Sequence, residues 1–117
     1  MQLEIRVHLA TNMIIVGVKT NFTGCHRWED VEDEAVQFLA NWHRHIFYVN
    51  MQVEVTDANR EIEFFTLKRE LGEYCLRFHN EYFEYSCEQI AEMIAGHFDA
   101  RQVSVSEDNE NYGLFIK

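Results

Sequence analysis

Apolar and polar residues alternate at several places along the chain. Residues 3–9 and 45–55 carry apolar side chains at nearly every second position. Because successive side chains of a strand point to opposite faces, this period of two predicts a strand with one buried face in each place. Residues 13–22 are rich in β-branched side chains, residues 102–106 alternate over a shorter stretch, and residues 112–117 follow a turn; all three segments are predicted as strands.

Three other segments show the spacing of a helix. Residues 28–42 begin with a strongly acidic stretch and predict a short helix with its acids at the positive N-terminal end. Residues 66–77 predict an amphipathic helix. Ser86 is predicted to cap a third helix, because Gln89 three residues later completes a capping box. The apolar faces of the second and third helices are predicted to contain Leu67, Leu71, Tyr74, Cys75 and Phe78, and Ile90, Ala91, Met93, Ile94 and Phe98.

The order of these elements determines the fold class that we expect. Residues 62–64 are predicted to be extended and residues 78–85 to form a loop, so that strands and helices occur in separate runs. Such runs predict an α+β domain. A length of 117 residues predicts one domain over residues 1–117. With 47% hydrophobic and 14% aromatic residues, the composition argues against disorder.

Charge narrows the range of partners. The chain has 20 acidic and 10 basic residues, and its net charge is −10. Nucleic acids and anionic membranes are bound by clustered Lys and Arg, which the sequence lacks, so we expect neither as a partner. A small uncharged or cationic ligand or a protein partner remains possible, and a nucleotide remains possible where local basic groups or a metal offset the overall charge.

The sequence also predicts a cytoplasmic location. No apolar run approaches the roughly 20 residues that a transmembrane helix needs, and the alternating N-terminus is unlike a signal peptide. The three cysteines show no CxxC spacing, and their odd number does not suit a disulfide framework. Reduced cytoplasmic thiols are therefore expected.

The histidines carry the candidate chemistry. His43 and His45 lie two positions apart at the start of a predicted strand, so both imidazoles point to the same face. His26 lies at the far end of the preceding strand and comes opposite this pair if the two strands are antiparallel. Three convergent imidazoles are typical of a catalytic zinc site. On spacing alone, ordinary surface histidines are a slightly simpler interpretation; the position of the third histidine favours the metal. Of the others, only His79 is a candidate for chemistry.

Six short motifs then follow one another in the order of a known family. They are Phe22-Thr23-Gly24-Cys25-His26, His43-Arg44-His45, Val53-Glu54-Val55, Glu63-Phe64-Phe65-Thr66-Leu67-Lys68, Ser86-Cys87-Glu88-Gln89 and Val103-Ser104-Val105-Ser106-Glu107. From about residue 13 onward, the chain resembles the 6-pyruvoyl-tetrahydropterin synthase family, which includes the bacterial 6-carboxy-tetrahydropterin synthases.

This resemblance implies a T-fold. The expected architecture is an antiparallel four-stranded sheet with two helices on one face and a short helical insertion between the first long strands. It implies a homo-oligomer, a trimer ring or a hexamer. It also implies that zinc is held by His26, His43 and His45, and that Glu107 anchors the guanidine-like edge of a pterin or purine-like ligand. Without the resemblance, Glu107 would be interpreted as an ordinary turn acid.

The chain departs from the family at its catalytic positions. The family has His-Gly-His where this chain has His43-Arg44-His45. Leu39 stands where the family has its catalytic cysteine, four residues before the first of these histidines. The nearest cysteine, Cys25, is expected to point to the opposite face of its strand. The family's Asp-His pair is reduced to His79, and Arg44 replaces a glycine. His79 is therefore the candidate catalytic residue, with Cys25 or an acidic residue as alternatives.

Three functions remain open from the sequence. The first is a zinc-dependent lyase that acts on a pterin or a related purine-like molecule. The second is a non-catalytic oligomer on the same scaffold that senses or sequesters a purine-like ligand or nucleotide, with Arg27, Arg44 and Lys68 available for phosphates. The third is an interaction protein in which the acidic residues 29–34 form a contact surface and the histidines are incidental.

Overall fold

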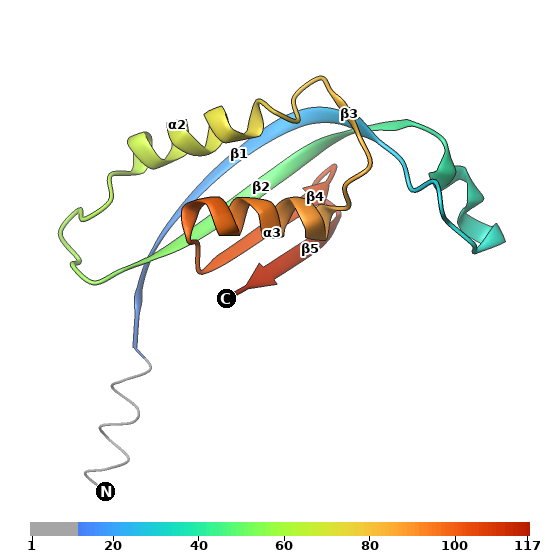
Figure 1. Ribbon diagram of the computed structural model, residues 1–117. Helices are drawn as coiled ribbons and strands as arrows, with labels where there is room; N and C mark the ends of the chain where they lie inside the picture. The colour runs from blue at the N-terminus through green and yellow to red at the C-terminus, as the bar shows by residue number, and fades with distance from the viewer. Residues whose placement is uncertain (1–11) are drawn as a thin grey trace, which may run out of the picture.

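The computed structural model describes residues 12–117, and the strand predicted at residues 3–9 lies outside this part. One curled sheet forms the framework (Figure 1). Its strands, in spatial order, are β3 (Tyr82–Phe83), β1 (Ile14–His26), β2 (His43–Val55), β4 (Gln102–Glu107) and β5 (Asn111–Ile116). The neighbouring strands β1, β2, β4 and β5 pair antiparallel, whereas β3 pairs parallel with β1.

The long strands β1 and β2 are paired along their whole length, from Ile14 opposite Val55 to His26 opposite His43. On β2 the buried side chains fall at every second position, as the period of two predicts: Phe47, Val49, Met51, Val53 and Val55. The intervening side chains face away from the core. This pairing brings the end of β1 and the start of β2 together at one corner of the sheet.

Two helices cover one face of the sheet (Figure 1). The α2 helix (Phe64–Cys75) packs against β1, and the α3 helix (Cys87–Phe98) packs against β4 and β5. Most of the predicted apolar faces is confirmed: the helices bury Leu67, Leu71, Tyr74, Cys75, Ile90, Ala91 and Ile94, Met93 and Phe98 are partly buried, and the buried Phe78 lies just beyond the end of α2. Burial of this apolar surface between the helices and the sheet is the main stabilising contribution to the fold.

Side chains satisfy the free amides at the start of both helices. The predicted capping box of α3 is present: the Gln89 amide donates to Ser86 Oγ at 3.1 Å, and the Ser86 amide donates to Gln89 Oε1 at 2.8 Å. At the start of α2, the Glu63 carboxylate accepts the amides of Phe65 and Thr66 at 2.9 and 2.7 Å. These bonds hold the pKa of Glu63 below its ordinary value.

The short helical insertion expected between the first long strands is present as a 3-10 helix, η1 (Glu34–Ala40), which is shorter than the predicted residues 28–42; it buries no side chain, and Val36 interrupts it with non-helical angles. Two other local predictions were wrong. Residues 62–64 form no strand: Glu63 has extended angles as the N-cap of α2, and the helix already begins at Phe64. The loop expected at residues 78–85 contains β3, so the sheet has five strands and is mixed rather than four-stranded and antiparallel.

The fold class and the two helices on one face agree with the expectation. Within residues 12–117, no helix has both the length and the apolar character that a membrane crossing needs.

Candidate metal centre and adjoining cavity

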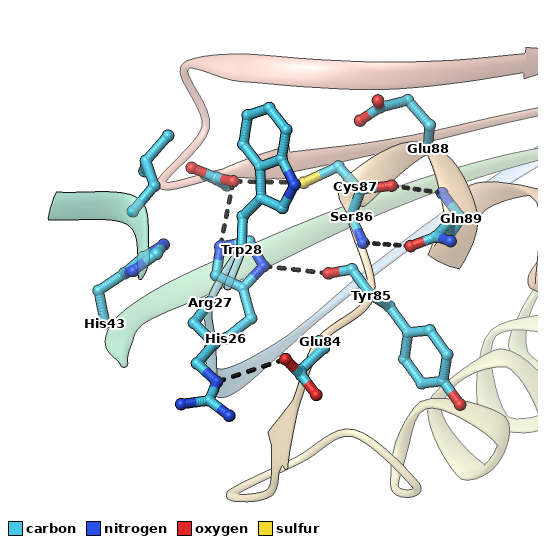
Figure 2. Close-up of a pocket in the computed structure, with 12 residues that line it drawn as sticks. His26, Arg27, Trp28, His43, Glu84, Tyr85, Ser86, Cys87, Glu88 and Gln89 are labelled. Atoms are coloured by element: carbon cyan, nitrogen blue, oxygen red, sulfur yellow. Dashed lines mark hydrogen bonds and ion pairs between the residues drawn. The ribbon is translucent and has the colours of Figure 1, made fainter. Parts of the chain in front are cut away.

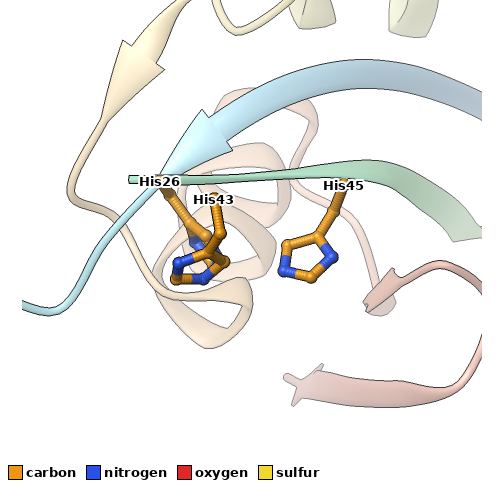
Figure 3. A group of neighbouring side chains, drawn as sticks. All are labelled: His26, His43 and His45. Atoms are coloured by element: carbon orange, nitrogen blue, oxygen red, sulfur yellow. The ribbon is translucent and has the colours of Figure 1, made fainter. Parts of the chain in front are cut away.

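Three histidines meet at the corner where β1 ends and β2 begins (Figure 3). His26 and His43 are direct partners in the ladder, and His45 lies two residues further along β2 on the same face. The ring centroids are 4.6 Å apart for His26–His43, 5.0 Å for His43–His45 and 5.3 Å for His26–His45. One ring nitrogen of each lies within 4.8 Å of the others, a spacing at which all three can hold one metal ion.

The other nitrogen of each ring is held by an oxygen acceptor. His26 Nδ1 lies 3.1 Å from the Tyr85 carbonyl oxygen, and His43 Nδ1 lies 2.8 Å from the Asn41 carbonyl oxygen. His45 Nδ1 lies 2.7 Å from Asp108 Oδ2. Because a carbonyl or carboxylate oxygen only accepts, each Nδ1 is the donor in these contacts, which leaves Nε2 as the nitrogen of each ring that can bind a metal. Metal-binding histidines are oriented by this type of hydrogen bond.

His26 provides the test of whether a metal fits. Its side chain is only 9% exposed, and its Nε2 is a buried polar atom with no hydrogen-bond partner in the described structure. Burial lowers the pKa of His26, although the Tyr85 carbonyl and the nearby Glu107 carboxylate oppose this shift. A buried neutral imidazole with a free nitrogen is costly unless something binds it. A metal ion satisfies this nitrogen, so the residues present fit zinc.

Glu107, the last residue of β4, adjoins the histidines. Its Oε1 lies 3.3 Å from His26 Nε2, and its Oε2 lies 3.3 Å from His45 Nε2. The pairing of β4 with β2 places Glu107 opposite Phe47, two residues from His45. The carboxylate therefore forms part of the boundary between the histidine cluster and the adjoining cavity.

The cavity has a volume of about 670 Å³ and lies between the end of β1, η1 and the start of α3 (Figure 2). Its lining includes His26, His43, Arg27, Trp28, Leu39, Glu84, Tyr85, Cys87, Glu88 and Glu107. Among residues 12–117, Arg27 contributes the only guanidinium of the lining, and that group is paired with Glu84 at 3.3 Å and with Glu29 at 3.4 Å. Three carboxylates and one guanidinium leave the lining acidic.

Neither a scan against protein-family models nor a search of curated proteins gave a match. Among solved structures, the chain is similar to the 6-pyruvoyl tetrahydropterin synthase of Caenorhabditis elegans, with a TM-score of 0.64 over 91% of this chain and 96% of that chain. The chain has the fold of that synthase. The T-fold expected from the six motifs is thereby confirmed. Sequence identity is 14%, so the likeness establishes the fold alone.

Within this T-fold, the predicted site residues fall into two groups. His26, His43 and Glu107 line the cavity, His45 completes the histidine cluster, and Leu39 lines the same cavity. His79 and Cys25 do not line it. His79 is exposed in the segment after α2, where its Nδ1 accepts the Thr23 amide at 3.2 Å. The catalytic role of His79 therefore stays a prediction.

Of the three cations that were expected to be available for phosphates, only one lies at the cavity. Arg27 lines the cavity, whereas Arg44 and Lys68 do not. Arg44 lies between the two histidines of β2, and its exposed side chain follows the alternation of the strand away from them. In the part of the chain that the structure describes, the one guanidinium at the cavity is therefore the one that two carboxylates already hold.

Sequence reasoning missed two side chains and two carbonyl groups at the site. Asp108, in the turn after β4, orients His45, and the carbonyl groups of Tyr85 and Asn41 orient the other two rings. A carbonyl group has no sequence signature. Asp108 is detectable only once β4 is paired with β2, because its amide then donates to the Ile46 carbonyl at 2.7 Å.

Cys87, the first residue of α3, is the second missed side chain. Its thiol lies 3.9 Å from Glu107 Oε1. Burial, together with the charges of Glu107 and Glu88, raises the pKa of Cys87 to about 12. The thiol therefore stays protonated near neutral pH, and Cys87 does not replace the thiolate of a catalytic cysteine.

Proposed function

We propose that the protein holds zinc through His26, His43 and His45 and that it binds or acts on a pterin or purine-like small molecule in the adjoining cavity. The observation that carries this proposal is the arrangement of the three rings: each Nδ1 faces an oxygen acceptor, and the buried Nε2 of His26 has no hydrogen-bond partner. Three neutral nitrogen ligands with one open position are typical of a zinc ion that meets a substrate.

The cavity residues have complementary roles in this proposal. Zinc, when bound, would polarise a hydroxyl or carbonyl oxygen on the side chain of the ligand. Glu107 would accept two N–H bonds from the guanidine-like edge of the ring, a charge-assisted contact. The position of Glu107 supports this role, because the carboxylate lines the cavity and the side chain is 31% exposed.

A lyase of the 6-pyruvoyl-tetrahydropterin synthase type is one form of this function. Proton abstraction beside a carbonyl group needs a base within hydrogen-bond reach. Leu39 has no titratable group, and the thiol of Cys87 stays protonated. His79 is the proposed base, but in the single chain it lies outside the cavity lining, so the lyase form requires His79 to reach the ligand from outside this lining.

The second form is a non-catalytic protein that senses or sequesters a purine-like ligand or nucleotide. It is favoured by one observation: the cavity is lined by Leu39 at the position where the family resemblance implies the catalytic cysteine. A binding protein needs the zinc, the ring anchor and the cavity, but it needs no base.

We also propose that the chain is a homo-oligomer, a trimer ring or a hexamer, located in the cytoplasm. Within residues 12–117 the sheet ends at β3 on one side and at β5 on the other, and these edges support the proposal because strands of another copy can pair with them. Cys25, Cys75 and Cys87 are all free, which supports a reducing compartment.

Native mass spectrometry combined with an activity assay tests this proposal. The zinc-loaded protein is incubated with dihydroneopterin, with its triphosphate and with guanosine, and mass spectra report bound zinc, bound ligand and oligomer size. Zinc-dependent turnover that is lost in His43→Ala supports the lyase. Ligand retention without turnover supports the binding protein. A protein that is fully loaded with zinc but retains and converts none of these molecules contradicts both forms.

A further inference from the structure

The two tryptophans of the chain have different surroundings. Trp42 is 41% exposed, and its ring is already in contact with other groups: the Arg27 guanidinium lies 4.4 Å from the ring centre, and the Tyr82 ring packs edge-on at 5.2 Å. Trp28 is 55% exposed and lines the cavity. Within residues 12–117, neither an aromatic ring nor a guanidinium stacks on Trp28. Figure 2 shows its indole among the side chains that surround the cavity.

The backbone of Trp28 is fixed although its indole is exposed. Its amide donates to the Leu39 carbonyl oxygen at 2.7 Å, and its own carbonyl accepts the Val31 amide at 3.4 Å. Val31 is buried, with 6% of its surface exposed, and anchors this segment. A large flat apolar side chain is therefore held in place at a cavity with one of its surfaces uncovered. Aromatic side chains in pockets commonly provide contact area for ligand rings.

The charges of the cavity restrict which rings suit this surface. Glu84, Glu88 and Glu107 face a single guanidinium, Arg27, which is paired with Glu84 and Glu29. A zinc dication at the histidines would only bring the lining to neutrality. The described residues of the lining thus offer no free positive charge to a triphosphate, whereas the carboxylates favour a ring with N–H donors.

We infer that Trp28 is the stacking surface for a planar heteroaromatic ligand that carries an N–H donor edge and no phosphate. This inference rests on the proposed function and specifies its ligand class. The ring lies against the indole of Trp28, and Glu107 accepts from its N–H edge. Aromatic stacking tolerates different rings, so Trp28 contributes affinity, whereas the Glu107 carboxylate contributes selectivity for the donor edge.

The two tryptophans give a matched set of variants for the test. Binding of dihydroneopterin, guanosine and their triphosphates to the zinc-loaded full chain is measured by calorimetry for wild type, Trp28→Leu, Trp28→Phe and Trp42→Phe. Trp28→Leu is expected to weaken binding of the phosphate-free ligands about ten-fold or more, and Trp28→Phe, which keeps a flat ring, by less than about three-fold. In Trp42→Phe, affinity stays unchanged, and the fluorescence of the remaining indole, Trp28, is quenched on binding.

Several results would overturn the inference. Wild-type affinity in Trp28→Leu, or an unquenched indole in ligand-saturated Trp42→Phe, excludes stacking on Trp28 but leaves the proposed function intact. A triphosphate that binds about ten-fold more tightly than its phosphate-free counterpart excludes the phosphate-free class. If none of the four molecules binds the zinc-loaded wild type, the proposed function itself fails, and the inference fails with it.

Discussion

Asp108 Oδ2 lies 2.7 Å from His45 Nδ1, and Oδ1 of the same carboxylate accepts the Ile46 amide at 3.0 Å. One acidic side chain thus binds both the imidazole and the backbone of β2. These two hydrogen bonds hold the pKa of Asp108 below its ordinary value. The carboxylate therefore stays ionised and fixes His45 with its Nε2 available to a metal.

We predict that Asp108→Asn weakens zinc binding about ten- to hundred-fold, because the amide orients His45 less strongly than the carboxylate does. The substitution preserves the backbone, since asparagine tolerates the left-handed conformation of this residue, with φ at 52°. Competition with a chromophoric chelator measures the affinity. Asp99→Asn is the matched control, because Asp99 has the same φ of 52° at the end of α3 and should leave zinc affinity unchanged. Equal affinities for all three proteins would exclude the orienting role.

Gly113 on β5 lies close to Glu88, a cavity residue at the start of α3, and this contact leads to a prediction about stability. A Cβ at this position would lie 2.6 Å from the Glu88 amide nitrogen and 2.9 Å from the Glu88 Cα. These are backbone atoms at the start of α3, so the helix would have to shift. We predict that Gly113→Ala destabilises the protein by about 1–3 kcal/mol, measured by urea unfolding.

Gly96 is the matched control for this substitution. A Cβ at Gly96 meets nothing within 4 Å, and the residue lies within α3. Gly96→Ala is expected to stabilise the protein by about 0.5–1 kcal/mol, because alanine is the better helix former. A Gly113→Ala variant as stable as Gly96→Ala would contradict the close packing of β5 on α3.

The Glu63 cap predicts a pH dependence of stability. The amides of Phe65 and Thr66 lower the pKa of Glu63 in the folded protein relative to the unfolded chain. A lowered folded pKa contributes stability above the unfolded pKa, and this contribution is lost as pH falls through the folded pKa. We expect Glu63→Gln to lower the free energy of unfolding by the largest amount near neutral pH. In acid, the stability of the variant should approach that of the wild type. Urea unfolding from pH 7 down to about pH 3 measures the difference; a constant difference over this range would contradict the ionic cap.

The sequence predicted correctly those features whose local pattern agrees with the strand pairing and packing of the folded chain. The alternation along β2 predicted its buried face, and the spacing of His43 and His45 placed both rings on one face. Antiparallel pairing then brought His26 opposite His43, as expected. The Ser86 capping box was predictable because all its bonds lie within four residues.

Other features depend on contacts between distant segments. The two residues of β3 are a strand only because they pair with the end of β1, more than 50 positions away. The acidic residues 29–34 suggested a longer helix, but η1 buries no side chain against the core, so packing does not extend it. The orienting roles of Asp108 and of the Tyr85 carbonyl require strand pairing and loop geometry that no local pattern encodes.

The zinc content of the purified protein decides whether the three histidines bind a metal. Wild type and variants are saturated with zinc and dialysed, and the bound metal is determined by elemental analysis, with circular dichroism as the control for folding. We predict one zinc per chain for the wild type and for His97→Ala, because the exposed His97 ring packs against Tyr74 in another part of the fold. We predict loss of zinc in a folded His43→Ala protein. A wild type without zinc, or His43→Ala with a full equivalent, would contradict the assignment of the metal to His26, His43 and His45.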